Sequence, residues 1–366
     1  MPLYMDVHIV PGVNAKDVAE AHRKDLLIQE EHECKCMTYW IDEERESIFC
    51  LIEAPAKEAV VEMHNRAHGL IPNKVIEVSS GLVSSFLGRI YDPLEAEISS
   101  DGLKIFSDPS FRILMVTKIT DPILLHHKSG GEKANNLLEQ QDAIIRKNIS
   151  QYEGSEVEHG GTGFITSFSS AVKAVSCAVA IQKDIASVQS DLADFRIGIN
   201  AGVPIEKTNR LFGDTIQFAE YLCAIAKNSK IAIASSVKEL VPRDYFHNAG
   251  KHFLTLWPQD ETLLELLFNK LEENYRDTDF DITEYCHVAA MSKSQLYRKT
   301  IALTGLSPNL LLKDFRLEKA KELMKKKGDN ISEITFVTGF TSPSYFTKCF
   351  KKKYGLLPMT YMDLLK

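Results

Sequence analysis

The sequence lacks any long apolar run: no stretch approaches the roughly 18 residues of a membrane-spanning helix, so we expect no membrane span. Its first residues, MPLYMDVHIV, contain no basic segment before the apolar one, which argues against a secretory signal peptide. Its seven cysteines are odd in number and lack the spacing of a disulfide framework. We therefore expect reduced thiols and a cytoplasmic location.

Basic residues are outnumbered by acidic ones in the chain as a whole but not at its end. The 366 residues carry a net charge of −7, and 44% hydrophobic and 25% charged residues are ordinary for a globular protein. Residues 290–366 hold 15 Lys+Arg against 6 Asp+Glu, a net of +9, so residues 1–289 carry −16. A basic end on an acidic protein is typical of phosphate contacts with nucleic acid.

Two runs in the basic end, MSKSQLYRKT and GFTSPSYFTKCFKKKYG, share one pattern. In each, a serine (Ser292 or Ser342) can cap a helix by accepting a backbone N–H of the first turn. Apolar residues follow on one face, and polar residues stand at i, i+3 and i+4 on the other. A short helix is expected before each run. Both units thus predict a helix-turn-helix, whose second helix, here called the reading helix, enters a DNA major groove.

The two units differ at two matching places. The turn of the second unit contains Gly339, which tolerates positive φ, whereas the first unit has Ala290. Thr300 stands where the second unit has Phe350, so we expect the first reading helix to pack less firmly. Between the units, residues 309–324 predict one long amphipathic helix that holds the reading helices on one side, roughly one DNA turn apart.

These runs resemble the C-terminal DNA-binding domain of the AraC family, through SKSQLYRK, TGLSP, FRLEKAKELM, ISEITFVTGF, SYFTKCFKKKYG and Pro358. The resemblance covers roughly the last quarter of the chain and implies double-stranded DNA as a partner. It implies base reading by Ser294, Tyr297, Arg298, Pro343, Ser344, Thr347 and Lys348, with only apolar contact or helix shaping from Pro343. The expected phosphate contacts are Lys351, Lys352 and Lys353, with Arg316 and Lys319 as weaker candidates. Solvated helix faces are the alternative interpretation, but two capped repeats favour DNA.

Residues 1–80 predict the order β-α-β-β-α-β, the ferredoxin-like layout with two helices on one face of an antiparallel sheet. Histidines gather in this segment. His64 and His68 lie four apart on one predicted helix, His22 lies on the other, and Cys50 lies on a strand. Imidazole with thiolate suits nickel, zinc or copper. Alternatively, the cysteine is a small buried apolar residue and the histidines are surface residues.

The same segment resembles a small bacterial family of ferredoxin-like proteins, some of which bind nickel. The resemblance rests on DVHIVPG, EAHRKDL, TYWIDEE, FCLIEAP and MHNRAHGLIP and spans nearly all of residues 1–80. It implies nickel or another transition metal as the one cofactor to be considered. We expect His22, Cys50 and His64 as ligands, with His8 and His68 in reserve.

Residues 81–109 are rich in Ser, Gly, Asp and Pro and predict a linker with at most one short helix. Over residues 110–257, a second βαββαβ pattern with additions is expected. Its predicted elements include a helix over 135–152 and a strand over 231–235. The runs VEHGGTGFITSF, FRIGINAGVP and LFGDTIQFAEYLCAIAKNSKIAIASSV resemble a class III nucleotide cyclase domain.

The cyclase resemblance fails at the positions that carry the chemistry. A cyclase needs two carboxylates to hold two metal ions on the triphosphate. The resemblance places Lys118 and Thr162 there, Glu158 and Arg210 at the base-contacting positions, and Gln217 and Tyr221 at the transition-state positions. A lysine where Mg²⁺ should lie opposes metal binding. We therefore expect no cyclase activity, but dimerisation and relay, with a bound nucleotide or other small ligand as the alternative.

The expected architecture is α+β: two ferredoxin-like βαββαβ domains (1–80 and 110–257) followed by an all-α double helix-turn-helix domain (258–366). An apolar helix near residues 261–275 either pairs two protomers or packs on the DNA-binding domain. The expected function is a dimeric, sequence-specific transcription regulator that is not an enzyme and responds to a metal or small molecule. The alternatives are a divergent nucleotide cyclase with an attached DNA-binding domain, or a scaffold that binds DNA without regulating it.

Overall fold

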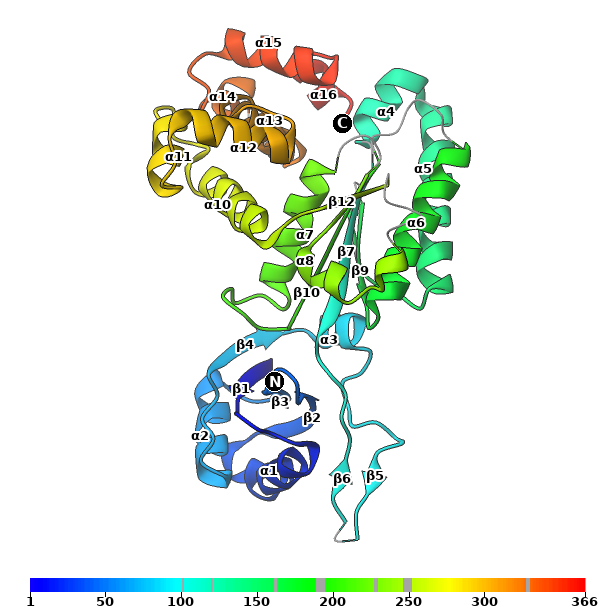
Figure 1. The fold of residues 1–366 in the computed structure, drawn as a ribbon, viewed down its shortest axis with the longest axis vertical. Helices are drawn as coiled ribbons and strands as arrows, with labels where there is room; N and C mark the ends of the chain where they lie inside the picture. Colours follow the sequence, from blue (N-terminus) through cyan, green and yellow to red (C-terminus); the bar gives the residue numbers. More distant parts are fainter. Residues whose placement is uncertain are drawn as a thin grey trace.

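Three regions follow one another along the longest axis of the molecule: an N-terminal sheet unit, a second sheet unit and a group of C-terminal helices (Figure 1). We call the first two the first unit and the second unit. The computed structural model describes residues 1–100, 102–119, 121–160, 163–188, 195–226, 230–245, 252–326 and 330–365. Thr162, one of the two expected carboxylate positions of a cyclase, lies outside these residues.

The first unit is a four-stranded antiparallel sheet in the order β2-β3-β1-β4. Its elements are β1 (Leu3–Ile9), α1 (Ala15–Ile28), the 3-10 helix η1 (Gln29–His32), β2 (Lys35–Asp42), β3 (Ser47–Glu53), α2 (Lys57–Ala67) and β4 (Lys74–Val78). Alternation of apolar side chains along the strands gives the sheet two apolar faces, and α1 and α2 pack on one of them. The predicted ferredoxin-like layout is confirmed.

The second unit is a six-stranded mixed sheet in the order β12-β11-β10-β7-β9-β8. Its elements are β7 (Arg112–Lys118), α4 (Pro122–Ser129), α5 (Gly131–Gln151), β8 (Ser155–Gly160), β9 (Gly163–Phe168), α6 (Ala171–Val188), β10 (Arg196–Gly202), α7 (Gly213–Ile225), β11 (Ile231–Ile233), α8 (Ser235–Glu239) and β12 (Phe253–Thr255). The antiparallel part, β10-β7-β9-β8, repeats the order β4-β1-β3-β2 of the first unit. The second ferredoxin-like layout is therefore confirmed, with two parallel strands added at one edge.

Two predicted elements of the second unit are present but have different bounds. Instead of one helix beginning at residue 135, α4 begins at Pro122 and α5 begins at Gly131. The carboxylate of Asp121 caps α4 by accepting the N–H of Ile123 at 3.1 Å, a cap-and-proline start that the sequence already carried. The strand expected over residues 231–235 ends at Ile233, because Ser235 already opens α8.

One apolar cluster joins the two sheets. It combines the first sheet's other face with the segment expected as a linker, which holds α3 (Ser80–Leu87), β5 (Glu97–Ile98) and β6 (Lys104–Ile105). The buried members include Met5, Trp40 and Leu51 of the first sheet, Val83, Phe86 and Leu87 of α3, and Leu114, Leu211 and Phe212 of the second unit. The first unit and α3 thus cover part of the second sheet.

The C-terminal helices are α10 (Pro258–Asn274), α11 (Ile282–Val288), α12 (Lys293–Thr304), α13 (Pro308–Lys325), α14 (Ile331–Val337), α15 (Pro343–Tyr354) and α16 (Pro358–Asp363). The predicted all-α double helix-turn-helix and its long connecting helix, α13, are confirmed. Four leucines of α10 are buried in a core that continues from the second sheet into α11, α12 and α13. Of the two expectations for this apolar helix, packing within the chain is therefore the one observed.

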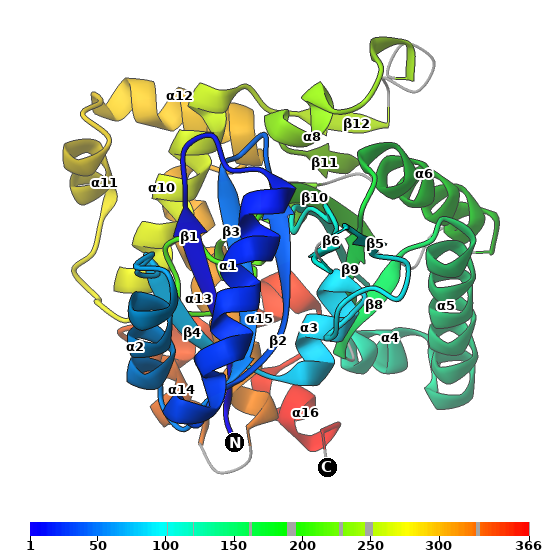
Figure 2. The same cartoon turned by 90° about the horizontal axis from the view of Figure 1, so that it is seen from below.

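Seen from below, α5 and α6 lie together on one side of the second sheet, away from α10 and α11 (Figure 2). In the part of the chain that the structure describes, no helix is both long and apolar enough to cross a membrane.

Candidate DNA interface and candidate metal centre

Both reading helices, α12 and α15, begin at the predicted serines. Ser292 Oγ accepts the N–H of Gln295 at 3.3 Å, and the Gln295 side chain accepts the N–H of Ser292 at 3.1 Å, which completes a capping box. Ser342 Oγ accepts the N–H of Tyr345 at 3.4 Å. Each helix ends at a glycine with left-handed backbone, as helix C-termini commonly do. The start of each helix, and with it the outward stripe, is therefore fixed locally.

The turns before the two reading helices share a left-handed residue. Gly339 has φ of 76°, and Ala290 has φ of 50° at the matching place. A β-carbon on Gly339 would lie 2.2 Å from the carbonyl oxygen of Tyr275, so the second turn needs glycine for space as well as for backbone conformation. The first turn holds an alanine in a conformation that L residues rarely adopt, which costs about 1–2 kcal/mol.

The predicted base-reading residues lie on the outer faces of the two helices. Exposed or half-buried are Ser294, Tyr297 and Arg298 in α12, and Pro343, Ser344, Thr347 and Lys348 in α15. The opposite faces are buried, with Leu296 and Thr300 in α12 and Phe346 and Phe350 in α15. Each helix is thus held by one face while the other is free to approach base edges.

The basic residues near the reading helices fall into two groups. Lys351 and Lys352 are exposed and form no ion pair within the described residues, so both are free to meet phosphates. Lys353 instead contacts Asp314 at 3.5 Å and Glu318 at 3.2 Å, which ties α15 to α13. The two weaker candidates are also engaged. Arg316 donates to backbone carbonyls after α10, and Lys319 pairs with glutamates of α10 and α13.

A buried carboxylate joins the second unit to the second helix-turn-helix. Asp121, which is 7% exposed, accepts a hydrogen bond from the Tyr361 hydroxyl at 2.9 Å. The same carboxylate lies 3.3 Å from the Lys321 ammonium and 3.5 Å from that of Lys325. Ile123 and Leu124 of α4 pack on the apolar cluster of α14 to α16. We call this contact the α4 latch. Burial alone would raise the pKa of Asp121, but the two lysines and the tyrosine outweigh it and lower that pKa.

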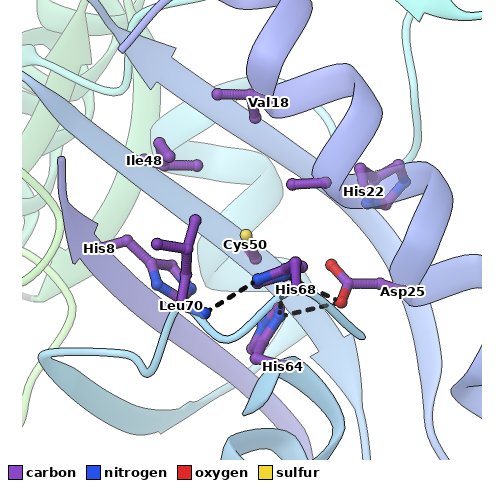
Figure 3. Close-up of a pocket in the computed structure, with 10 residues that line it drawn as sticks. His8, Val18, His22, Asp25, Ile48, Cys50, His64, His68 and Leu70 are labelled. Carbon is purple, nitrogen blue, oxygen red and sulfur yellow. Dashed lines mark hydrogen bonds and ion pairs between the residues drawn. The ribbon is translucent and has the colours of Figure 1, made fainter. Parts of the chain in front are cut away.

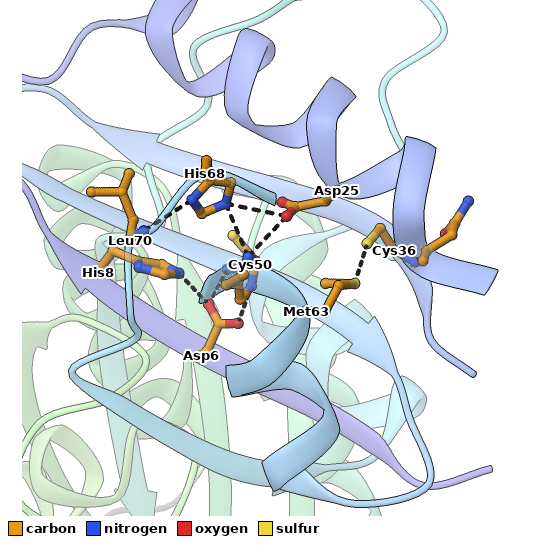
Figure 4. A network of polar contacts seen from close by, with 10 residues as sticks. Asp6, His8, Asp25, Cys36, Cys50, Met63, His68 and Leu70 are labelled. Atoms are coloured by element: carbon orange, nitrogen blue, oxygen red, sulfur yellow. Dashed lines mark hydrogen bonds and ion pairs between the residues drawn. The ribbon is translucent and has the colours of Figure 1, made fainter. Parts of the chain in front are cut away.

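The first unit holds a cluster of buried ionisable side chains between its sheet and its helices (Figures 3 and 4). His64 of α2 lies at its centre. Its Nε2 is 2.9 Å from a carboxylate oxygen of Asp6 on β1, and its Nδ1 is 3.1 Å from one of Asp25 on α1. His68 Nε2 contacts the same Asp25 oxygen at 3.1 Å, and His8 Nε2 lies 3.3 Å from Asp6.

These contacts control the charge of the cluster. Burial by itself would lower the pKa of His64, but Asp6 and Asp25 outweigh burial and raise it to about 10. Burial opposes ionisation of the two carboxyls, yet the surrounding histidines lower the pKa of both. Burial and the nearby Asp6 raise the pKa of the Cys50 thiol well above its usual value. A cation held by His64 or Cys50 must therefore displace a proton.

The cluster fits a small transition-metal ion. Ligand atoms of Asp6, His8, Cys50 and His64 all lie within 4.8 Å of one another, and those of Asp25, His64 and His68 form a second such group. Among the described residues, His8 Nδ1 is buried without a hydrogen-bond partner, so it is available as a ligand. A cavity of about 20 Å³ beside these groups is large enough for one water or ion.

The sequence named most of this cluster but not its carboxylates. Cys50, His64 and His8 come together, and His68 joins His64 in the second group. His22 lines the small cavity, but its ring packs on Tyr39 with 5.2 Å between ring centroids, and it belongs to neither group.

Sequence reasoning missed Asp6 and Asp25, although a signal for each was present. Asp6 precedes His8 by two residues, which places both on one face of a strand. Asp25 follows His22 by three residues on a helix, which places the two on neighbouring positions.

Among the described residues, those at the expected cyclase positions form no metal-binding group. Lys118 is exposed at the end of β7. Gln217 donates to the Tyr221 hydroxyl at 2.7 Å, and that hydroxyl donates to Asn269 of α10 at 2.9 Å, so both side chains connect α7 to α10. Within the described residues, both groups able to hold a metal lie in the first unit rather than the second.

Two family profiles match the chain. Residues 4–78 match the family described as nickel responsive protein SCO4226-like, and residues 285–363 match a helix-turn-helix domain family. The chain thus carries an SCO4226-like unit near its start and an AraC-type helix-turn-helix near its end. Of the resemblances seen in the sequence, those of residues 1–80 and of the C-terminal quarter are confirmed.

Similarity to individual proteins covers parts of the chain. Histidine kinase P4 of Formosa agariphila is 35% identical over 122 residues, 32% of this chain and 9% of that protein. HTH-type transcriptional regulator MtrA of Neisseria gonorrhoeae is 32% identical over 103 residues, 28% of this chain and 34% of that protein. An adenylate/guanylate cyclase/hydrolase structure from Silicibacter pomeroyi matches 36% of this chain and 79% of its own, at 22% identity and a TM-score of 0.31. The chain spans about a third or less of the two curated relatives.

Proposed function

We propose that this chain is a sequence-specific, DNA-binding transcription regulator of the cytoplasm, with a transition-metal ion as its signal. The observation that carries the proposal is the pair of capped reading helices, each with an exposed polar stripe and a buried opposite face. The helix-turn-helix match at residues 285–363 and the similarity to a transcriptional regulator support it. The net charge of +9 over residues 290–366 favours association with the DNA backbone.

Genome-wide footprinting of the full-length protein, with and without added nickel, tests this proposal. We expect a limited set of promoter sites and a change in occupancy when the metal is added. Uniform binding along the genome in both conditions would contradict sequence-specific regulation.

In this proposal the metal is held by Cys50, His8 and His64, with Asp6 as a fourth ligand. Imidazole and thiolate ligands suit nickel, copper or zinc, and the SCO4226-like match supports nickel. Bound metal would supply a fixed positive charge between β1, β3 and α2. The carboxylate of Asp6 lies 3.3 Å from His8 Nε2 and 2.9 Å from His64 Nε2, so it is within reach of an ion held by the two histidines.

Calorimetric titration of the full-length chain with nickel, zinc and copper tests the metal site. Cys50→Ser and His8→Ala are expected to weaken binding by about 10-fold or more, since each removes a ligand. His252→Ala, which changes an exposed histidine before β12, is the matched control and should leave binding unchanged. Absence of heat with all three metals would overturn the metal signal but not DNA binding.

We also propose that the second unit has no cyclase activity. Lys118 stands where a metal carboxylate is required, and Gln217 and Tyr221 are engaged with α10. Incubation with ATP or GTP and Mn²⁺ should yield no cyclic nucleotide, and a cyclic product would restore the enzyme alternative.

Finally, we propose that the regulator is a homodimer. The first unit and α3 already cover part of the second sheet, so a second copy would dock on another surface. Light scattering of the purified chain should give twice the mass of 41.2 kDa, and a mass of one chain at micromolar concentration would contradict the dimer.

A further inference from the structure

A second cavity lies in the seam between the first and second units. Its volume is about 420 Å³, which is within the roughly 300–1,000 Å³ typical of small-molecule sites. Its walls come from β4 and α3 on one side and from β8, β9, the loop before α7 and α7 itself on the other. We call it the seam cleft. The buried metal cluster shares no lining residue with it.

The lining of the seam cleft is apolar with a few charged groups. Seven apolar side chains line it: Val78, Leu82, Phe86, Val157, Ile165, Leu211 and Ile216. Its charged groups are two carboxylates, Glu77 and Glu158, and one guanidinium, Arg210. Among the described residues these three form no ion pair with any partner, so their charges are available to a ligand. The apolar walls favour a flat or bulky apolar body.

The balance of charge decides which ligands suit this cleft. Two carboxylates against one guanidinium give a net negative lining, and no lysine lines the cleft. A nucleoside triphosphate carries several negative charges and would meet a single cation here, so it is disfavoured. A molecule with an apolar body and an ammonium or amidinium group matches both the walls and the carboxylates.

We propose that the seam cleft binds a small organic cation with an apolar, aromatic-sized body. The site is distinct from the metal cluster, and its occupation would add contacts between the two units. Binding itself does not depend on the proposed DNA-binding function.

The loop that forms one wall of the cleft is fixed to the first unit by one lysine. Lys74 Nζ, at the start of β4, donates to the backbone carbonyls of Glu206, Lys207 and Thr208 at 3.1, 2.8 and 2.7 Å. Asp214 of α7 accepts from both the backbone N–H and the hydroxyl of Thr208 at 2.9 Å. The wall that carries Arg210 is therefore held on both sides, and the cleft is preformed.

The test compares two probes of similar size and opposite charge, 2-phenylethylamine and phenylacetate, with ATP as a third probe. Each is titrated against the full-length chain by ligand-observed NMR. We expect the amine to bind at least about fivefold more tightly than the acid and ATP not to compete with it. Glu77→Gln and Glu158→Gln should each weaken the amine about two- to fivefold, as expected for an exposed ion pair. Arg210→Gln should strengthen it.

Two further variants separate the cleft from general surface charge. Glu156→Gln changes a neighbouring carboxylate of β8 that pairs with Arg146 and does not line the cleft, so it should leave amine binding unchanged. Leu82→Trp, at a side chain that is 41% exposed on α3, should fill the cleft and abolish binding. Tighter binding of phenylacetate or ATP, an amine signal that survives Leu82→Trp, or no binding of any probe would each overturn the proposal.

Discussion

The two helix-turn-helix units have the same layout but are held in different ways. The α14–α15 unit has its own apolar cluster, in which Phe346, Phe350 and Tyr361 are buried. The buried residues of the α11–α12 unit, such as Leu296, belong instead to the core that runs through α10 into the second sheet. The first helix-turn-helix therefore shares its core with α10 and the second sheet, whereas the second has a separate core with α13, on which α4 packs.

Local details follow the same division. Thr300 is fully buried, and its hydroxyl has no hydrogen-bond partner among the described residues, whereas Phe350 fills the matching place with an aromatic ring. Ala290 adopts a left-handed conformation where the second helix-turn-helix has Gly339. The first helix-turn-helix thus carries two local costs that the second avoids. It follows that packing against α10, which joins the first helix-turn-helix to the second sheet, supplies stability that the local sequence lacks.

The largest expected effect comes from emptying the second cluster. Phe350→Ala should destabilise the α14–α16 region by about 3–5 kcal/mol, because a large buried ring is removed. Hydrogen exchange measured along the chain should show faster exchange in α15 and little change in α12. Thr300→Ala, at the matching place in the first helix-turn-helix, is the control and should destabilise the protein much less. Equal effects of the two substitutions would contradict the difference between the cores.

Gly339→Ala should be the next largest change. The left-handed backbone alone costs about 1–2 kcal/mol. The new β-carbon would also collide with the carbonyl oxygen of Tyr275, 2.2 Å away, and with Arg316. Thermal unfolding and operator binding should both be impaired. If the variant is as stable as the parent protein, the close approach of the second turn to the end of α10 is not a real constraint.

Breaking the α4 latch should cost less. Asp121→Asn removes the charge beside Lys321 and Lys325 and should destabilise the docking of the second helix-turn-helix by about 1–3 kcal/mol. Since the folded protein lowers the pKa of Asp121, the carboxylate stabilises the fold above its unfolded pKa and ceases to do so as pH falls through the lower folded value. The difference between parent and variant in urea unfolding should therefore be full at pH 7 and shrink below about pH 4. A difference independent of pH would exclude this charge as the cause.

The exposed stripes are tested by binding rather than stability. Arg298→Ala should weaken operator binding by about 1–3 kcal/mol and relax preference at one base, if its guanidinium contacts guanine. Lys352→Ala, the phosphate-contact comparison, should weaken operator and random DNA alike and reduce the salt dependence. Electrophoretic mobility shifts on both DNAs measure the two effects. Equal losses on random and operator DNA from Arg298→Ala would remove its role in reading bases.

The smallest expected change is a gain. Ala290→Gly should stabilise the first helix-turn-helix by about 0.5–1 kcal/mol, because relief of the left-handed strain exceeds the added freedom of the unfolded glycine. A small rise in the thermal midpoint, with operator affinity unchanged, is the expected result. A fall in the midpoint would show that the first turn is not strained.

Local signals in the sequence were sufficient for the elements and for the caps of the reading helices. Ser292 and Ser342 act within one turn of their own position, as does the left-handed backbone of Gly339, so these roles could be predicted. The close approach of Gly339 to Tyr275 could not be predicted. The α4 latch could not, because Asp121 meets Tyr361 across 240 positions of the chain. Lys353 has the same charge as Lys351 and Lys352, yet only the fold brings it to Glu318.

The metal cluster shows the same limit. Histidines and a cysteine attract attention by residue type, whereas the carboxylates of Asp6 and Asp25 become partners of His64 only when β1, α1 and α2 assemble. His22 has the right type and spacing, but its ring packs on Tyr39. Pattern alone therefore identified the region and most of the candidate ligands, and tertiary packing decided which of them meet.

The central claim is that both reading helices enter the same face of one DNA duplex. Hydroxyl-radical footprinting of the full-length protein on a bound promoter fragment tests it most directly. We expect two protected segments about 10 base pairs apart, of which Arg298→Ala weakens one and Lys348→Ala weakens the other. A single protected segment, or two that respond alike to both substitutions, would contradict the account.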